Sequence, residues 1–264
     1  YLEEDVLHNG YVVIRDGKII EIGDGLPEEA VQLEESNHKA FPEGSKLVPG
    51  MIDLHIHGAY GTDVMDANLD ALANMVSQLP KEGTTSFLAT TITQEPKAIE
   101  NALSNIKTYM EHPIQTGAEI LGVHLEGPYI NKNNAGAQPL DYIIPPSKEQ
   151  FEYWNTLSGN HIKLVTLAPE SANGMAFIQF ITKQGIVASI GHSSATYEEV
   201  VKAISAGARH VTHLFNGLNG LHHREPGVVG SAFLLETLFT ELIVDGIHVA
   251  PEVVNLAYKV IGEE

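Results

Sequence analysis

The chain has 264 residues, of which 43% are hydrophobic and 19% charged, enough for one large globular unit or a large domain with a small companion. Its formal net charge of −19 excludes nucleic acid as a partner, because phosphates would be repelled by the surface. The absence of cysteine excludes disulfides and thiolate metal sites. No apolar run approaches the roughly 20 residues that cross a bilayer, and the opening residues lack a signal-peptide pattern. We therefore expect a soluble, cytoplasmic protein without a membrane partner.

The first predicted element is a β-hairpin over residues 11–23, where two apolar runs are joined by Asp16-Gly17. Asp-Gly is the dipeptide that a two-residue hairpin turn prefers. The acidic, irregular stretch 24–45 indicates a linking excursion with room for one more strand. A small β domain is therefore expected over residues 1–46.

Short apolar segments alternate with helix-like stretches from residue 47 onward, a pattern typical of a parallel sheet. Nearly continuous apolar runs indicate strands covered on both faces, as in a barrel or a doubly wound sheet. A closed (β/α)8 barrel needs eight strands, and seven are predicted, so the barrel domain over 47–264 is expected to be incomplete at its C-terminal end. The strands are predicted at 47–57, 85–92, 119–127, 162–170, 186–193, 210–216 and 241–249, and the helices at 69–82, 96–111, 147–157, 173–184 and 197–206.

Metal-binding side chains stand at or near the ends of four of these strands. His55 and His57 are two residues apart on the first strand, so both face the barrel interior near its C-terminal mouth. Glu126 ends the third strand, His192 ends the fifth, and His213 lies in the sixth. Each could instead be a hydrogen-bonded core residue, but burying so many without a partner would cost several kcal/mol apiece. Their agreement predicts a site for a divalent metal, whether zinc, iron or manganese.

Two further histidines lie on these strands. His248, in the seventh, is either another metal ligand or a hydrogen-bond donor to a substrate carbonyl, and we favour the donor because it can stabilise a developing oxyanion. His124 shares the face of Glu126 but sits deeper, which is typical of a core histidine.

The loop after the sixth strand, residues 215–230, carries the densest positive cluster of this acidic chain, around Arg224. The arginine fork suits a phosphate or a carboxylate, whereas the alternative is a solvated charge paired with Glu225. Asn216 and Gly217 could offer amide groups to a polar substrate.

Several strings in the chain resemble the amidohydrolase superfamily and, within it, the family of N-acetylglucosamine-6-phosphate deacetylases. They are PGMIDLHIHG, GVHLEGPYIN, SIGHSSATYEE, HVTHLFNGLN, HHREPGVVG and VDGIHV. The resemblance implies a β-sandwich beside a TIM-type metal-dependent hydrolase barrel. It implies that Glu126, His192 and His213 bind a principal metal, and that His55 and His57 complete a second position, giving one or two ions.

The same resemblance implies an activity: deacetylation of N-acetyl-D-glucosamine 6-phosphate to D-glucosamine 6-phosphate and acetate, in amino-sugar catabolism. Arg224 would bind the phosphate of this small-molecule partner, with Asn216 and Gly217 nearby. His248 would polarise the acetyl carbonyl, and Gln138 stands where relatives have a substrate-facing histidine. The general acid/base aspartate of the family ends the eighth strand and is not among residues 1–264.

The family also implies a homodimer. Two alternatives stay open. One is another amidohydrolase acting on cyclic amides or N-acyl amino acids, and the other is a catalytically inactive, metal-binding fragment.

Overall fold

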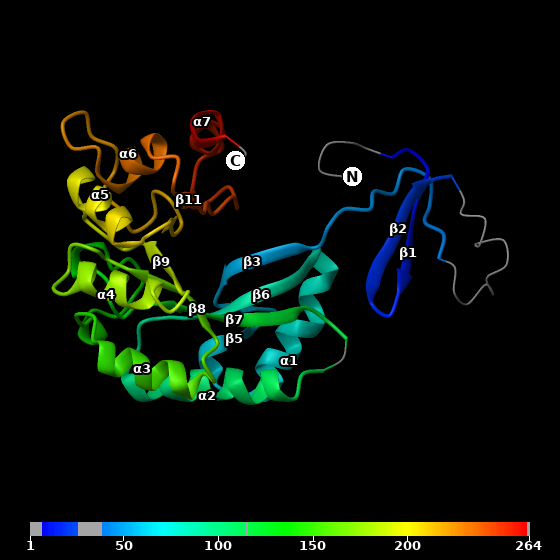
Figure 1. The fold of residues 1–264 in the computed structure, drawn as a ribbon, viewed down its shortest axis with the longest axis horizontal. Helices are drawn as coiled ribbons and strands as arrows, with labels where there is room; N and C mark the ends of the chain where they lie inside the picture. Colours follow the sequence, from blue (N-terminus) through cyan, green and yellow to red (C-terminus); the bar gives the residue numbers. More distant parts are fainter. Residues whose placement is uncertain (1–6, 26–38, 115, 263–264) are drawn as a thin grey trace. The chain divides into compact units, whose positions relative to one another are not determined.

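A computed structural model describes residues 7–25, 39–114 and 116–262 (Figure 1). The backbone divides into two compact units, residues 1–50 and 51–264. The assignment of residues 1–46 to a β-sandwich and of 47–264 to a barrel stays a prediction. Among the described residues, no helix is both long and apolar enough to span a membrane.

The first unit contains the predicted hairpin, formed by β1 (Gly10–Arg15) and β2 (Lys18–Asp24). The two strands pair antiparallel, and Arg15 lies opposite Lys18. Asp16 and Gly17 have φ angles of 52° and 72°, the left-handed values that this turn requires at both positions. The hairpin prediction is confirmed. The additional strand predicted within 24–45 falls mostly on residues 26–38, outside the described part of the chain.

The second unit is built on a seven-stranded parallel sheet whose strand order repeats the order of the strands in the chain. Each strand pairs with its predecessor, as in consecutive units of a (β/α) barrel, and the predicted fold class is confirmed. The strands are β3 (Met51–Ile56), β6 (Thr84–Thr91), β7 (Glu119–Glu126), β8 (Ile162–Leu167), β9 (Val187–Ile190), β10 (His210–Val211) and β11 (Phe239–Thr240). Two short strands, β4 (Gly58–Ala59) and β5 (Thr62–Asp63), pair separately.

The last strand differs from its predicted position. We predicted residues 241–249, whereas β11 covers Phe239–Thr240, with backbone hydrogen bonds to the neighbouring segment continuing only as far as Glu241. The physical reason is a local turn: the side chain of Asp245 accepts hydrogen bonds from the backbone N–H groups of Ile247 and His248. This competes with an extended conformation.

Helices follow most strands, and α1, α2 and α3 lie together on one side of the sheet (Figure 1). The five predicted helices are present within a few residues of their expected bounds. Two more helices, α6 and α7, were not predicted. The residues of α6 are almost all apolar, so its sequence shows no amphipathic period. The helices are α1 (Leu69–Gln78), α2 (Pro96–Glu111), α3 (Lys148–Leu157), α4 (Gly174–Thr182), α5 (Tyr197–Ala206), α6 (Gly227–Leu234) and α7 (Pro251–Ile261).

The two faces of the sheet have opposite character. On β7, Val123 and Leu125 join the apolar core, whereas His124 and Glu126 are equally buried but point to the other face. Thr166 on β8 and Ser189 on β9 are likewise buried polar residues. The inner face therefore supplies a polar interior, and the candidate site lies at its C-terminal edge.

Candidate metal centre

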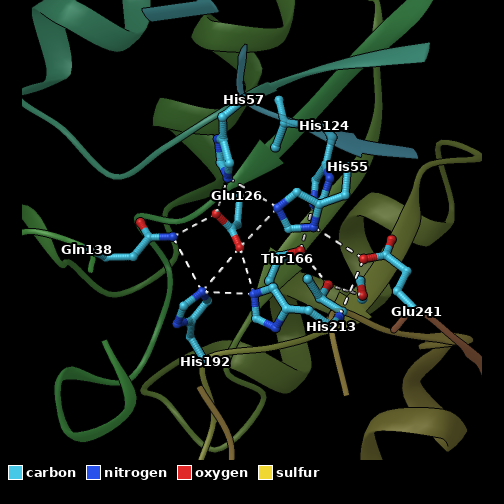
Figure 2. A network of polar contacts seen from close by, with 12 residues as sticks. His55, His57, His124, Glu126, Gln138, Thr166, His192, His213 and Glu241 are labelled. Atoms are coloured by element: carbon cyan, nitrogen blue, oxygen red, sulfur yellow. Dashed lines mark hydrogen bonds and ion pairs between the residues drawn. The ribbon is translucent and has the colours of Figure 1, made fainter. Parts of the chain in front are cut away.

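The predicted metal-binding residues come together at the C-terminal ends of four strands (Figure 2). His55 lies within β3 and His57 follows it directly, Glu126 is the last residue of β7, and His192 and His213 come two residues after β9 and β10. The backbones of His192 and His213 are left-handed, with φ angles of 46° and 31°. Such angles are uncommon outside glycine, and here they occur where the chain turns out of the strand.

Glu126 is the centre of the cluster, with only 2% of its surface exposed. Its Oε1 lies 3.0 Å from His213 Nε2, 3.1 Å from His192 Nε2 and 3.4 Å from His55 Nε2. Its Oε2 lies 3.1 Å from His57 Nε2. Burial raises the pKa of this carboxyl, but hydrogen bonds from the four imidazoles outweigh burial and hold the pKa well below its ordinary value. Glu126 is therefore an ionised carboxylate shared by four histidines.

Two overlapping sets of residues could each hold a metal ion, with ligand atoms within 4.8 Å of one another. One set is His55, His57 and Glu126, and the other is Glu126, His192 and His213. Imidazole nitrogens and a carboxylate oxygen suit zinc, iron and manganese. Glu126 belongs to both sets, so one side chain would serve both positions.

The tautomer of His192 fits a metal. Its Nδ1 lies 2.8 Å from the carbonyl oxygen of Asn134, which can only accept, so Nδ1 carries a proton and Nε2 is the nitrogen that a metal would bind. That Nε2 faces His213 Nε2 at 3.2 Å. Two ring nitrogens this close need either a proton or a cation between them. The donor set of the cluster therefore fits a divalent ion.

Glu241 holds the far side of His55. Its Oε2 lies 3.2 Å from His55 Nδ1, so the imidazole is placed between two carboxylates. Burial lowers the pKa of His55, but hydrogen bonds to Glu126 and Glu241 outweigh it and raise the pKa to about 10. Without metal, His55 is protonated on both nitrogens. A metal at Nε2 would replace one proton, and the other would stay on Nδ1 and be donated to Glu241, which is the arrangement of a carboxylate–histidine–metal triad.

This pKa leads to a prediction for the metal-free protein. The folded-state pKa lies above the value of 6.5 of an ordinary histidine, so the two ion pairs stabilise the fold fully below that pH. Their contribution is lost as the pH rises through about 10. Thermal melting in EDTA is expected to lose more stability between about pH 7 and about pH 10 in the wild type than in His55→Asn. Parallel pH curves for the two proteins would contradict the assignment.

A chain of hydrogen bonds crosses the inner face beneath the metal ligands. Its direction is fixed at one end, because His124 Nδ1 must donate to a carbonyl oxygen, so His124 Nε2 accepts from a hydroxyl. Burial, and then the charge of His55, lower the pKa of His124 to about 3, so His124 stays neutral, as expected for a core histidine. The chain links Leu54 O, His124, Thr166, Thr212, Ser189 and His210 at distances of 2.5 to 3.0 Å.

Gln138 lies inside the cluster. Its Nε2 donates to Glu126 Oε2 at 2.8 Å, and its Oε1 accepts from the backbone N–H of Thr93 at 2.8 Å. The side chain is buried, and its Nε2 also lies 3.4 Å from His192 Nε2. Both ends of the amide are thus engaged by protein atoms, and the residue supports the Glu126 carboxylate.

Of the remaining predicted residues, Gly217 lies against this cluster and His248 does not. Gly217 packs against His192, since a Cβ at Gly217 would meet the His192 ring at 2.8 Å. Asn216 is half-buried on the same loop, and Arg224 is exposed. His248 is not brought into the cluster: it is exposed, and its Nδ1 is bonded to Asp245 Oδ2 at 2.6 Å.

Sequence reasoning did not single out Glu241 or the hydroxyl residues of the inner face. Glu241 was predicted only as the first residue of a strand, and its position became visible when β11 proved to end at Thr240. A signal was available for Thr166, which interrupts an otherwise apolar strand end in the same way as Glu126.

The Amidohydrolase family model matches residues 47–261, and the chain therefore belongs to the amidohydrolase family. Among its relatives, N-acetylglucosamine-6-phosphate deacetylase of Bacillus subtilis (strain 168) is 47% identical, over 98% of this chain and 65% of the relative. The same enzyme of Lysinibacillus sphaericus is 44% identical, over 96% and 64%.

A solved structure is also similar, that of a mutant N-acetyl-D-glucosamine-6-phosphate deacetylase from Mycobacterium smegmatis in complex with N-acetyl-D-glucosamine-6-phosphate. The TM-score is 0.84 at 28% identity, covering 98% of this chain and 65% of that one. The chain thus spans just under two thirds of the length of these relatives.

Proposed function

We propose that this protein is a metal-dependent amide hydrolase that removes acetate from N-acetyl-D-glucosamine 6-phosphate. One observation carries the proposal: an ionised, buried carboxylate, Glu126, is in contact with four imidazoles at a barrel mouth. The names of the relatives at 47% and 44% identity support the choice of substrate. The product amine would be D-glucosamine 6-phosphate.

Glu126, His192 and His213 would hold the first ion, and His55 and His57 with Glu126 the second, whether zinc, iron or manganese. A bound ion lowers the pKa of water, so that hydroxide forms near neutral pH, and polarises the carbonyl. The protein would keep the Nε2 atoms of these imidazoles free of protons, and Glu126 would supply one negative charge. The Asn134 carbonyl oxygen and the Glu241 carboxylate favour this state by accepting hydrogen bonds from the Nδ1–H groups of His192 and His55.

Three groups outside the cluster would bind substrate. His248 would donate to the acetyl oxygen, and its contact with Asp245 holds the Nδ1 side, which leaves Nε2 for the substrate. Arg224 would bind the phosphate, with Asn216 and Gly217 offering polar contacts nearby. Gln138, assigned to the substrate by resemblance, would act through its bond to Glu126. The protein is proposed to work as a cytoplasmic homodimer in amino-sugar catabolism.

The discriminating experiment compares acetate release from N-acetylglucosamine with and without its 6-phosphate, in the zinc-loaded protein. Strong preference for the phosphorylated sugar is the expected result. Equal rates would refute the substrate assignment and favour another amidohydrolase. Zinc binding without hydrolysis of either sugar would indicate a metal-binding protein without this activity.

Arg224→Ala is expected to weaken use of the phosphorylated sugar. Loss of a charge-assisted contact of about 1.5 to 3 kcal/mol lowers kcat/KM by about tenfold to a hundredfold. The non-phosphorylated sugar should be unaffected, and Arg209→Ala serves as a matched loss of charge, since the Arg209 guanidinium donates to the backbone carbonyls of Ile204 and Ala208. An equal effect of Arg224→Ala on both sugars would remove Arg224 from the phosphate site.

A further inference from the structure

We infer that Glu170, a carboxylate outside the metal cluster, is a positioning residue that fixes the backbone of His192 in its ligand conformation. The inference rests on the metal site of the proposed function and extends it to a residue that touches neither metal ligand nor substrate. Glu170 follows β8 and is half-buried at the mouth of the barrel, one strand away from His192.

Glu170 accepts three hydrogen bonds from two neighbouring loops. Its Oε1 accepts from the backbone N–H of Ser194 at 2.6 Å and from Asn131 Nδ2 at 2.9 Å. Its Oε2 accepts from the hydroxyl of Ser193 at 2.7 Å. All three donors are neutral, and bonds from such donors to a carboxylate are stronger than bonds between neutral groups. The loops after β7 and β9 are therefore tied to the end of β8 through one side chain.

His192 lies immediately before the two serines that Glu170 binds. Its backbone oxygen accepts from Asn131 N at 2.9 Å, and the N–H of the next residue, Ser193, donates to Gly217 O at 3.1 Å. Both bonds hold the peptide unit that joins His192 to Ser193, and Glu170 binds the side chains of Asn131 and Ser193 beside it. Asn131 takes part twice, through its backbone N–H to His192 and its side chain to Glu170.

This restraint is needed because His192 is left-handed, with a φ of 46°. Such a conformation in a non-glycine residue costs of order 1 to 3 kcal/mol and persists only where the surroundings determine it. If the loop relaxed, Nε2 of His192 would leave its position 3.1 Å from Glu126 Oε1. The carboxylate of Glu170 is the charged group that opposes this relaxation.

The test measures zinc affinity rather than activity. Glu170→Ala, Glu170→Gln and Ser193→Ala are made in the His57→Gln background, which retains only the Glu126, His192 and His213 position. The dissociation constant for zinc is measured by competition with a chromogenic chelator, and folding by thermal melting. Glu170→Ala is expected to weaken zinc binding by about tenfold to a hundredfold, as for other groups that orient a metal ligand. Glu170→Gln and Ser193→Ala are expected to have smaller effects.

The matched control is Glu199→Ala, which removes a nearby carboxylate that accepts two hydrogen bonds from Thr196, at 2.8 and 3.1 Å, rather than from residues 192–194. It should lower the melting temperature but leave zinc affinity unchanged. Zinc affinity of Glu170→Ala equal to that of the control would overturn the inference. If Glu170→Ala fails to fold, unchanged zinc affinity in both Glu170→Gln and Ser193→Ala would also overturn the inference. A parent protein that binds no zinc refutes the metal site and this inference together, whereas tight binding without acetate release refutes only the substrate.

Discussion

Replacing Glu126 with glutamine is expected to remove both metal positions at once. The carboxylate belongs to both sets of ligands, and it provides the only negative charge among the five residues of those sets. Metal analysis of the purified variant should find almost no bound zinc. Acetate release should fall at least about a thousandfold, because a catalytic metal contributes several kcal/mol of charge stabilisation in the transition state.

The matched comparison is His57→Gln, which alters only the His55, His57 and Glu126 set. This variant is expected to retain one zinc ion where the wild type binds two. Equal zinc content in Glu126→Gln and His57→Gln would show that Glu126 is not shared between the two positions. Retention of full activity by Glu126→Gln would refute the metal centre.

Trp154→Ala is expected to destabilise the fold by about 3 to 5 kcal/mol, a large part of the stability of an ordinary domain. Trp154 lies on α3 with 1% of its surface exposed and stacks on Tyr129 at a ring distance of 6.2 Å. Tyr129 in turn packs edge-on against Phe177 of α4 at 5.0 Å. The substitution leaves a cavity between these helices and the sheet, and denaturant unfolding measures its cost.

The adjacent residue provides the control. Tyr153 is on the same helix but 53% exposed, so Tyr153→Ala should change the free energy of unfolding by less than about 0.5 kcal/mol. A similar loss in both variants would contradict core packing as the cause, and helix propensity could not explain it either, because alanine is the better helix former at both positions.

The sequence was sufficient to predict the positions of all the strands of the sheet except the last, and the composition of the metal centre. Parallel strands carry continuous apolar runs, and a single polar residue at the end of such a run stands out, as with Glu126. Since all parallel strands end at one edge, those residues were expected to meet. Distances between them in the structure agree with that expectation, at 3.0 to 3.4 Å around Glu126.

Other parts depend on contacts that no local pattern contains. The exposed position of His248 is set by the Asp245 turn, which competes with a strand made of the same apolar residues. The bond from Gln138 to Glu126 spans 12 residues through a loop that contains one short 3-10 turn, Lys132–Asn134. Helix α6 was not predicted because its residues are almost all apolar, so it has no polar face to reveal its period.

The agreement between strand order and chain order has a consequence for how the centre is assembled. Each strand can pair with a neighbour that has already left the ribosome, which keeps contacts local and favours stepwise folding. His55, His57 and Glu126 are together once β7 is in place, but His213 follows Glu126 by 87 residues. The two metal positions are therefore completed at different stages of synthesis, and an ion captured early by the first would stabilise the sheet on which the second is built.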